Sequence, residues 1–307
     1  MMTPDVSIIG GGLAGLCAAV EAAASGAAVT CFESAPFFGG LVANVGRLDD
    51  YPGVADLGGA ALAEELVTRA KALDVAFVTE NVSSLTATAA GTTIVAGALN
   101  CRAKVAIVAS GARLRRLGIP GESELTGRGV SQCDWCDGGL YRGRHVAVVG
   151  GGNGSVQAAL HLAELCEKVT LITRGETLRA RRDLVLRAAD TETIEFQWQT
   201  VIDEVIGTNA VERLRLRTLL DDTRSDLVCD ALFVFAGLLP NLDFASDLPH
   251  DDAGFALTDA HYRTASPRVF VVGAARSGNC GSLISAMGEG SSAATSAIAD
   301  LRRFGEL

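Results

Sequence analysis

The sequence predicts an α/β protein made of two similar three-layer domains, with the second domain inserted into the first. Three observations lead to this fold class. Two stretches of the same design begin at Asp5 and at His145. Near the end of the chain, residues 265–304 read as a buried strand and a long alanine-rich helix, in the style of the first stretch. The length of 307 residues is too great for one ordinary core and suits two domains.

The two stretches read DVSIIGGGLAGLCAAVEAAASGAAVTCFES and HVAVVGGGNGSVQAALHLAELCEKVTLITR, and they align without a gap. Each predicts a short apolar strand, a loop of three glycines, an alanine-rich helix and a second strand. This is the order of a Rossmann-like nucleotide-binding unit. One such motif is weak evidence, whereas two in register predict two nucleotide sites. Tight turns that bind no ligand are the alternative.

Each loop has three small residues with different tasks. The first allows the tight turn, the second lets the backbone approach a pyrophosphate, and the third permits close packing of helix against strand. These residues are Gly10, Gly12 and Gly15 in the first stretch and Gly150, Gly152 and Ser155 in the second. The diphosphate of each nucleotide would then lie at the positive end of the helix that follows.

The two stretches differ where their second strand ends. Glu33 is placed to accept hydrogen bonds from a ribose diol, as expected for FAD or NAD. Thr173 takes that place in the second stretch and is followed by Arg174 and Arg179. Arginine attracts a 2′-phosphate, which an acid would repel. The first site is therefore predicted to bind FAD and the second NADP, although arginines after a strand are often a solvated face.

The remaining elements place the domain boundaries. Residues 92–121 read as strands that lead into a Gly/Pro crossover, and Glu195 to Leu219 alternates apolar and polar residues as a β-meander would. Residues 229–241 read as a buried strand that ends in a turn. We expect residues 1–113 and 241–307 to form the FAD-binding domain and residues 114–240 the NAD(P)H-binding domain.

The composition limits the partners. Hydrophobic residues make up 49% of the chain and charged residues 20%, which indicates an ordered globular protein. A net charge of −10 argues against nucleic acid or an anionic membrane as the main partner. We expect no membrane span, because no run of about 18 uncharged apolar residues occurs. The apolar N-terminus has no basic region and is broken by three glycines, so we expect no signal peptide and a cytoplasmic protein.

The stretch SQCDWCDGG places Cys133 and Cys136 three positions apart, shortly before the second glycine loop. This placing favours a redox disulfide, with half a zinc site or two incidental thiols as the alternatives. A zinc site would need a second Cys/His pair, and the four histidines are isolated. The other six cysteines are scattered singly, mostly within apolar runs, and we expect buried free thiols there: Cys17, Cys31, Cys101, Cys166, Cys229 and Cys280.

With these motifs in place, the chain resembles the low-molecular-weight thioredoxin reductases, a family of flavoprotein disulfide reductases. The resemblance covers essentially the full length, and the placing of CDWCDG just ahead of the second loop is distinctive. The motifs that carry it are IIGGGLAGLCAA, FFGGLVANVGRLDDYPG, IVASGARLRRLGIPGE, GVSQCDWCDGGLYRGRHVAVVGGGNGSVQAAL, VTLITR, FVFAGLLPN and RVFVVGA.

The resemblance implies an FAD domain interrupted by an NADPH domain, usually in a homodimer. It implies that Cys136 exchanges electrons with the flavin, that Cys133 attacks or releases the partner disulfide, and that Asp137 moves a proton to or from the flavin-side thiolate. A thiolate is the nucleophile in such exchange, and a neighbouring carboxyl can supply the proton that the leaving thiolate requires. Further cofactor-binding positions in the matched motifs are Gly40, Asp50, Gly111 and Gly273.

The flavin motifs of the family are incomplete in this chain. The family usually has Gly-Asp after its last strand, where the acid holds the ribityl chain, and here the pair is Gly273–Ala274. A following Arg-Gln-Ala segment aligns to residues 281–283, which read Gly-Ser-Leu, and a usual glutamine is Leu41. FAD remains the expected cofactor, held less tightly or in an altered pose.

The nucleotide motifs are incomplete as well. The family's His-Arg-Arg with a further Arg is here TRGETLR, so that Thr173 and Gly175 replace two of four positions. Gln157 replaces a usual acid. Each lost phosphate contact costs roughly 1–3 kcal/mol.

The leading hypothesis is an enzyme that passes electrons from NADPH through the flavin and the cysteine pair to a thioredoxin-like protein or a small disulfide. A rival keeps the flavin and the cysteines but changes the electron partner to oxygen or another redox protein, as a dithiol oxidase or a differently fed reductase. A third hypothesis is a non-catalytic flavin- or nucleotide-binding module.

Overall fold

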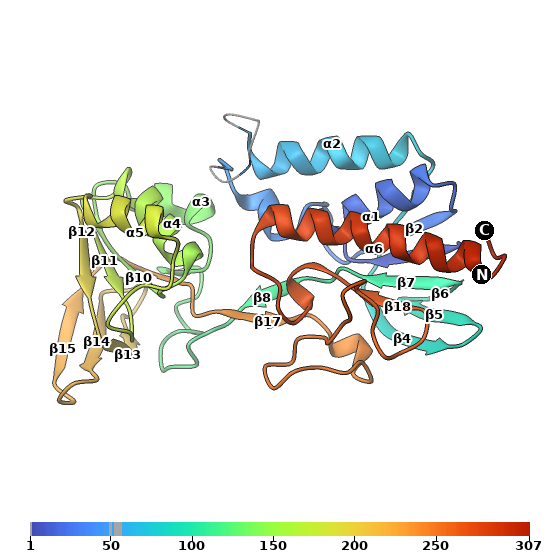
Figure 1. Ribbon diagram of the computed structural model, residues 1–307. Helices are drawn as coiled ribbons and strands as arrows, with labels where there is room; N and C mark the ends of the chain where they lie inside the picture. Colours follow the sequence, from blue (N-terminus) through green and yellow to red (C-terminus); the bar gives the residue numbers. More distant parts are fainter. Residues whose placement is uncertain (1, 49–50, 52–56) are drawn as a thin grey trace. The chain divides into compact units, whose positions relative to one another are not determined.

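The computed structural model describes residues 2–48, 51 and 57–307, which form two compact units (Figure 1). The first unit consists of Met1–Arg113 and Leu239–Leu307, and the second of Leu114–Leu238. Each unit is described by itself. Asp50, a predicted cofactor-binding residue, lies outside the described residues.

The first unit is built on a five-stranded parallel sheet in the order β18-β7-β1-β2-β3. Its strands are β1 (Val6–Ile9), β2 (Val29–Glu33), β3 (Ala76–Thr79), β7 (Val105–Val108) and β18 (Val269–Val271). Its helices are α1 (Leu13–Ala24), α2 (Gly59–Lys71) and α6 (Leu283–Arg303), and α6 packs along α1 (Figure 1). An antiparallel sheet of β4 (Val82–Thr88), β5 (Gly91–Ala96) and β6 (Leu99–Ala103) completes the unit.

Side chains of the parallel sheet alternate between two cores. Val6 and Ile8 of β1 pack with α1 and α6, whereas Ile9 belongs to the core beneath the antiparallel sheet. Successive residues of a strand point to opposite faces, so a sheet covered on both faces needs continuous apolar strands. The sequence VSII and its neighbours supply them, and the unit has three layers.

The second unit repeats this architecture. Its parallel sheet has the order β12-β11-β10-β16-β9, formed by β9 (Val130–Ser131), β10 (His145–Val149), β11 (Lys168–Ile172), β12 (Ile194–Gln197) and β16 (Ala231–Val234). Its helices are α3 (Asp134–Asp137), α4 (Asn153–Ala163) and α5 (Arg182–Ala189). The short strands β8 (Ala112–Leu114) and β17 (Leu238–Pro240) pair where the chain passes between the units.

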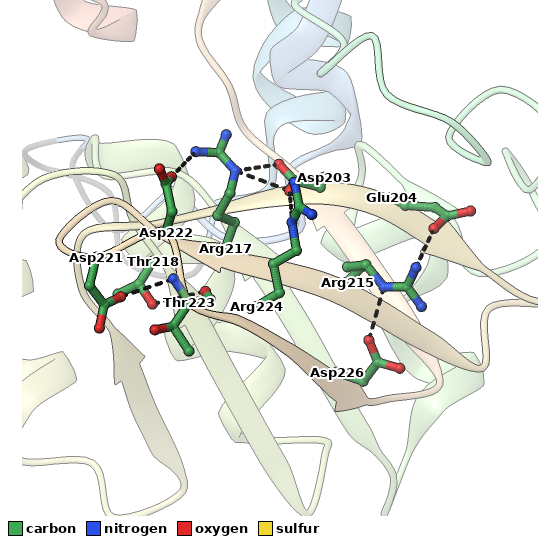
Figure 2. Close-up of polar contacts among 10 residues, drawn as sticks. All are labelled: Asp203, Glu204, Arg215, Arg217, Thr218, Asp221, Asp222, Thr223, Arg224 and Asp226. Carbon is green, nitrogen blue, oxygen red and sulfur yellow. Dashed lines mark hydrogen bonds and ion pairs between the residues drawn. The ribbon is translucent and has the colours of Figure 1, made fainter.

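An antiparallel sheet forms the third layer of the second unit. It consists of β13 (Thr200–Ile206), β14 (Arg213–Thr218) and β15 (Arg224–Val228). Leu214 and Leu216 are buried, while the arginines of β14 lie on the other face among acids (Figure 2). Arg217 Nε lies 3.0 Å from an oxygen of Asp203, and Arg215 pairs with Asp226 and Glu204. None of these residues lines the cavities described below.

The predicted α/β fold with parallel sheets is confirmed, and both repeated stretches form strand, loop, helix and strand. One boundary was wrong. Glu195 was expected in the meander, but β12 pairs in parallel with β11, and the antiparallel sheet begins at Thr200. An edge strand of a parallel sheet and a meander strand share the same apolar–polar alternation, so the pattern cannot separate them. No helix in the described ranges is long and apolar enough to cross a membrane.

Candidate functional site

The first glycine loop is required by the chain's own backbone. Gly10 has φ +107°, and a Cβ there would lie 2.3 Å from the carbonyl oxygen of Ala109. A Cβ on Gly15 would lie 1.9 Å from the carbonyl oxygen of Gly10. At Gly12, by contrast, the nearest atom to a Cβ would be Gly40 Cα at 3.9 Å. The first and third glycines therefore make the turn, and the second leaves open space beside the helix N-terminus.

Glu33 closes this loop from the end of β2. Its Oε2 accepts a hydrogen bond from Gly11 N at 2.7 Å, and its Oε1 accepts one from Ala35 N at 2.9 Å. Glu33 and Gly10 line a cavity of about 500 Å³ together with Ser110 and Asn81. Oε1 also accepts from Ser34 Oγ at 3.3 Å, whereas Oε2 has a second lone pair that can accept from a ribose hydroxyl.

Ser110 supplies an independent sign of a ligand in this cavity. Its Oγ is buried and, within the described part of the chain, has no hydrogen-bond partner. A buried hydroxyl without a partner is costly unless a ligand satisfies it. The open space at Gly12, the acid at Glu33 and this hydroxyl fit the diphosphate and ribose of FAD. Sequence reasoning missed Ser110, because a single serine after a strand carries no pattern.

Three further predicted cofactor positions have left-handed backbone. Gly40 (φ +61°) lies against Gly12, while Gly111 (φ +67°) has open space around its Cα. Gly273 (φ +68°) donates its N–H to Glu289 Oε2 at 2.8 Å. The structure brings Gly10, Gly12 and Gly40 together, and the cofactor roles of these glycines stay predictions.

Glu289 organises the loop where the family's Gly-Asp and Arg-Gln-Ala residues are absent. Only 6% of Glu289 is exposed, and its carboxylate accepts from Arg276 Nη2 at 2.7 Å and from Asn279 Nδ2 at 2.9 Å. Burial alone would raise the pKa of Glu289, but the hydrogen bonds from Arg276, Gly273 and Asn279 outweigh it and hold that pKa below its ordinary value. Sequence reasoning missed Glu289, because an acid between Gly288 and Gly290 forms no distinctive pattern.

The second glycine loop has the same turn with different closure. Gly150 has φ +149°, and a Cβ there would lie 2.6 Å from the Phe235 carbonyl oxygen. Gly152 has no atom within 4 Å of a Cβ position, so it too leaves open space. Ser155 Oγ donates to the Gly152 carbonyl at 2.8 Å. A serine is therefore accommodated where the first loop admits only glycine.

A cavity of about 680 Å³ lies in the second unit beside this loop. Gly150, Arg174, Arg179 and Glu176 are among its lining residues. Thr173 is buried at the end of β11, and its Oγ1 lies 3.3 Å from Gly175 N, which donates to it. The two predicted arginines thus reach one cavity, in which Glu176 partly offsets their charge.

Cys133 and Cys136 form a disulfide in the second unit. Cys133 is half-buried and Cys136 is exposed, and Cys136 N donates to Cys133 Sγ at 3.1 Å. Within the described residues no group of three or more His, Cys, Asp or Glu side chains is arranged to hold a metal. The pair is therefore available to thiol–disulfide exchange.

Asp137, the predicted proton-moving acid, lies directly beside the pair. Its Oδ2 accepts from Ser131 Oγ at 2.6 Å, and Ser131 Oγ in turn accepts from Cys133 N at 3.0 Å. The buried Ser131 thus fixes both the acid and the first cysteine. Sequence reasoning singled out Asp137 but missed Ser131, since serine at this spacing has no distinctive meaning.

The six other cysteines include an exception to the prediction. Cys31, Cys101, Cys166 and Cys229 are buried as expected, and Cys17 is half-buried. Burial raises the pKa of the Cys31 and Cys229 thiols to about 12, and the nearby carboxylates of Glu33 and Asp230 act in the same direction. Cys280 is exposed, because it lies in the loop before α6 and not in an apolar run.

Comparisons with known proteins agree on one family. The family model described as pyridine nucleotide-disulphide oxidoreductase matches residues 4–290. A thioredoxin reductase of Treponema pallidum (strain Nichols) is 35% identical over 294 residues, which are 95% of each chain. The crystal structure of Lactococcus lactis thioredoxin reductase superposes with a TM-score of 0.94 at 32% identity and covers 98% of this chain and 99% of that one. The crystal structure of T. acidophilum thioredoxin reductase superposes with a TM-score of 0.92 at 30% identity and covers 98% of this chain and 99% of that one.

The family match extends over most of the chain, and the relatives are aligned from end to end rather than through one motif. It agrees with the paired glycine loops and the disulfide described above. The chain therefore belongs to the pyridine nucleotide-disulphide oxidoreductases and, as the sequence predicted, to their thioredoxin reductase family of flavoprotein disulfide oxidoreductases.

Proposed function

We propose that this chain is an FAD-dependent thiol–disulfide oxidoreductase that uses NADPH to reduce a thioredoxin-like protein or a small disulfide through Cys133 and Cys136. The observation that carries this proposal is the Cys133–Cys136 disulfide, held beside Asp137 in a unit that also carries a glycine loop. When bound, the flavin supplies two-electron transfer between a nicotinamide and a disulfide.

The residues of the first unit fit FAD. Gly12 leaves room for the diphosphate at the N-terminus of α1, Glu33 can accept from the ribose, and Ser110 Oγ needs a partner. Family relationship supports the flavin, and these contacts support FAD in particular.

The cysteines complete the chemistry by disulfide exchange. In the dithiol form, the Cys133 thiolate attacks the partner disulfide, a mixed disulfide forms and one partner thiolate leaves. Cys136 then attacks Cys133 Sγ, which restores the protein disulfide and releases the second partner thiolate. Two protons pass to the partner's sulfurs, and Asp137, which the Ser131 hydroxyl holds beside the cysteines, can supply one of them.

NADPH as the donor rests on the cavity in the second unit. Arg174 and Arg179 line it, and no acid stands at position 173 to repel a 2′-phosphate. The roles of the glycines and arginines, the homodimer and the cytoplasmic location belong to this proposal as predictions.

A second candidate keeps the flavin and the cysteines but changes the electron partner. Thr173 and Gly175 stand where the family has His and Arg, and Glu176 shares the cavity with the two arginines that remain. This weakened anion site favours a dithiol oxidase, or a reductase fed by another redox protein, over an NADPH enzyme.

Anaerobic mixing decides between the two candidates. The purified flavoprotein is mixed with NADPH, and separately with NADH, while the visible absorbance of the flavin is followed. Fast bleaching by NADPH supports the reductase. No bleaching by either nucleotide, together with bleaching by a dithiol, would move the assignment to the second candidate.

The cysteine assignment has its own test. Cys136→Ser should lower turnover of a disulfide substrate at least 1,000-fold, because the variant cannot close the protein disulfide, while flavin binding stays normal. Cys17→Ala, which changes a half-buried cysteine in α1, is the matched control and should keep full turnover. Normal turnover in Cys136→Ser would disprove the assigned exchange.

A further inference from the structure

The two residues between the redox cysteines are both held by one side chain of α4. Asp134 Oδ2 accepts a hydrogen bond from His161 Nδ1 at 2.7 Å. The Trp135 ring stacks on the His161 imidazole, with ring centroids 3.7 Å apart and an angle of 16° between the planes. His161 therefore contacts both residues that lie between the two cysteines, Asp134 and Trp135.

The hydrogen bond between His161 and Asp134 is largely shielded from water. Only 14% of the His161 side chain and 13% of the Asp134 side chain are exposed. A hydrogen bond to a carboxylate at such burial is stronger than one on an open surface. Trp135 keeps 37% of its surface exposed, so it covers the imidazole and still faces solvent.

The same loop also packs against α4 at Gly138. A Cβ on Gly138 would lie 2.9 Å from Leu162 Cδ2, so the loop packs closely against α4 at this residue. His161 and Leu162 are neighbours in the last turns of α4, the helix that begins at the second glycine loop. The redox loop is thus fixed to a rigid element from both sides of Cys136.

From this geometry we infer that His161 is a positioning residue of the dithiol site, which sets how easily the Cys133–Cys136 disulfide is reduced. The inference rests on the proposed redox role of the pair. It does not depend on which donor supplies the electrons.

The direction of the effect follows from loop entropy. Reduction cuts the covalent link between the two sulfurs and leaves the loop free to move. Contacts that hold Asp134 and Trp135 in the arrangement of the closed ring lower the cost of closing it again. His161 therefore stabilises the disulfide relative to the dithiol, and loss of His161 makes the disulfide easier to reduce.

The equilibrium with glutathione measures this stabilisation. Two molecules of reduced glutathione convert the protein disulfide to two thiols and give one glutathione disulfide, so electrons and protons balance. The holoprotein is equilibrated anaerobically at fixed glutathione ratios and then denatured and alkylated. Mass spectrometry counts the protein molecules that carry two additional alkyl groups, against the six cysteines that are free throughout.

Two substitutions separate the two contacts. His161→Phe keeps a ring against Trp135 and loses the donor to Asp134, whereas His161→Gln keeps a donor and loses the ring. Each contact is worth roughly a two- to tenfold change in the equilibrium constant. We expect each variant to favour the dithiol by such a factor, and His161→Leu by more than either. His261→Gln, at an exposed histidine of the first unit, is the control and should match the wild type.

A double-mutant cycle on Asp134 and His161 distinguishes a specific coupling of the two side chains from a general disturbance of the structure. Asp134→Ala and the double variant with His161→Leu complete a cycle, in which the hydrogen-bonded pair should be non-additive in the logarithm of the equilibrium constant. Strict additivity, or an unchanged constant in His161→Leu, would overturn the inference. A wild-type disulfide that does not exchange with glutathione at all would instead count against the proposed function, so the two failures are distinguishable.

Discussion

The two glycine loops share one backbone design but are closed by different chemistry. In the first unit, a carboxylate closes the loop, since Glu33 accepts from Gly11 N at 2.7 Å. In the second unit, the same place holds Thr173, whose Oγ1 would lie 3.0 Å from a Cβ on Gly151. The third small residue differs as well, because Gly15 faces the Gly10 carbonyl while Ser155 donates to the Gly152 carbonyl.

The comparison separates the glycines that the backbone itself requires from those that leave room for a ligand. Gly10 and Gly150 are both demanded by a neighbouring carbonyl oxygen, with or without a nucleotide. Gly12 and Gly152 are the residues with open space beside a helix N-terminus. The first glycine thus makes the turn. The second leaves the space that we propose for the phosphate, and the residue that ends the second strand is the one that we propose selects the nucleotide.

The largest effect is expected from placing alanine at the third position of each loop. Gly15→Ala puts a methyl group 1.9 Å from a backbone oxygen that cannot move alone, so we expect a loss of about 2–4 kcal/mol in stability and loss of flavin. Ser155→Ala removes one hydrogen bond and should cost about 1 kcal/mol. Flavin content and thermal unfolding of the two variants give the comparison.

Both variants place alanine at the same position of the loop, Gly15→Ala by adding a methyl group and Ser155→Ala by removing a hydroxyl, so the two are compared directly. Similar unfolding temperatures for both would show that the first loop relaxes as readily as the second. The claim that its glycine is required by the backbone would then be wrong.

A smaller effect is expected from removing the group that closes each loop. Glu33→Ala leaves Gly11 N without its acceptor and removes the acceptor proposed for the ribose, so flavin affinity should fall roughly 10- to 100-fold. Thr173→Ala, the corresponding change in the second unit, should leave flavin affinity unchanged. Titration of flavin-free protein with FAD measures both. Equal affinity of Glu33→Ala and wild type would reduce the acid to a purely structural role.

Much of this molecule could be predicted from the sequence because its signals are local. The strand, loop and helix order around Gly10 and Gly150 depends on neighbouring residues alone, and so does the spacing of Cys133 and Cys136. The same holds for Glu33, which follows its strand at a fixed distance. These residues lie where the sequence placed them, and Thr173 is buried at the expected strand end.

Two of the contacts that sequence reasoning missed join residues distant in the chain. His161 meets Asp134 across 27 positions, and Glu289 meets Gly273 across 16. Each is a common residue type at a position without periodic meaning, so only the fold brings the partners together. The prediction that the meander begins at Glu195 was wrong for another reason. An edge strand of a parallel sheet and a meander strand show the same alternation of apolar and polar residues.

The smallest effect is expected on stability at low pH. It adds a second loop of the first unit, the one at Gly273, to the comparison. In the first unit, carboxylates accept hydrogen bonds from two loops, Glu33 from Gly11 N and Glu289 from Gly273 N. In the second unit, the glycine loop is held by the Ser155 hydroxyl, which donates to the Gly152 carbonyl and does not ionise at low pH. The pKa of Glu289 in the folded protein lies below its ordinary value of 4.5, which the unfolded chain is expected to show. Its contribution to stability is therefore complete above pH 4.5 and is lost as the pH falls through the folded-state pKa.

Glu289→Gln tests this by removing the titration while keeping an acceptor for the Gly273 N–H. The wild type should be the more stable protein at pH 7, because the neutral amide forms a weaker bond with Arg276. The difference in unfolding free energy should then shrink as the pH is lowered below 4.5. Ser155→Ala, whose lost hydroxyl does not titrate, should show a difference from wild type that is constant over the same range. A Glu289→Gln difference that is equally constant would mean that the pKa of Glu289 is the same in the folded and the unfolded chain, and that its charge does not stabilise this loop.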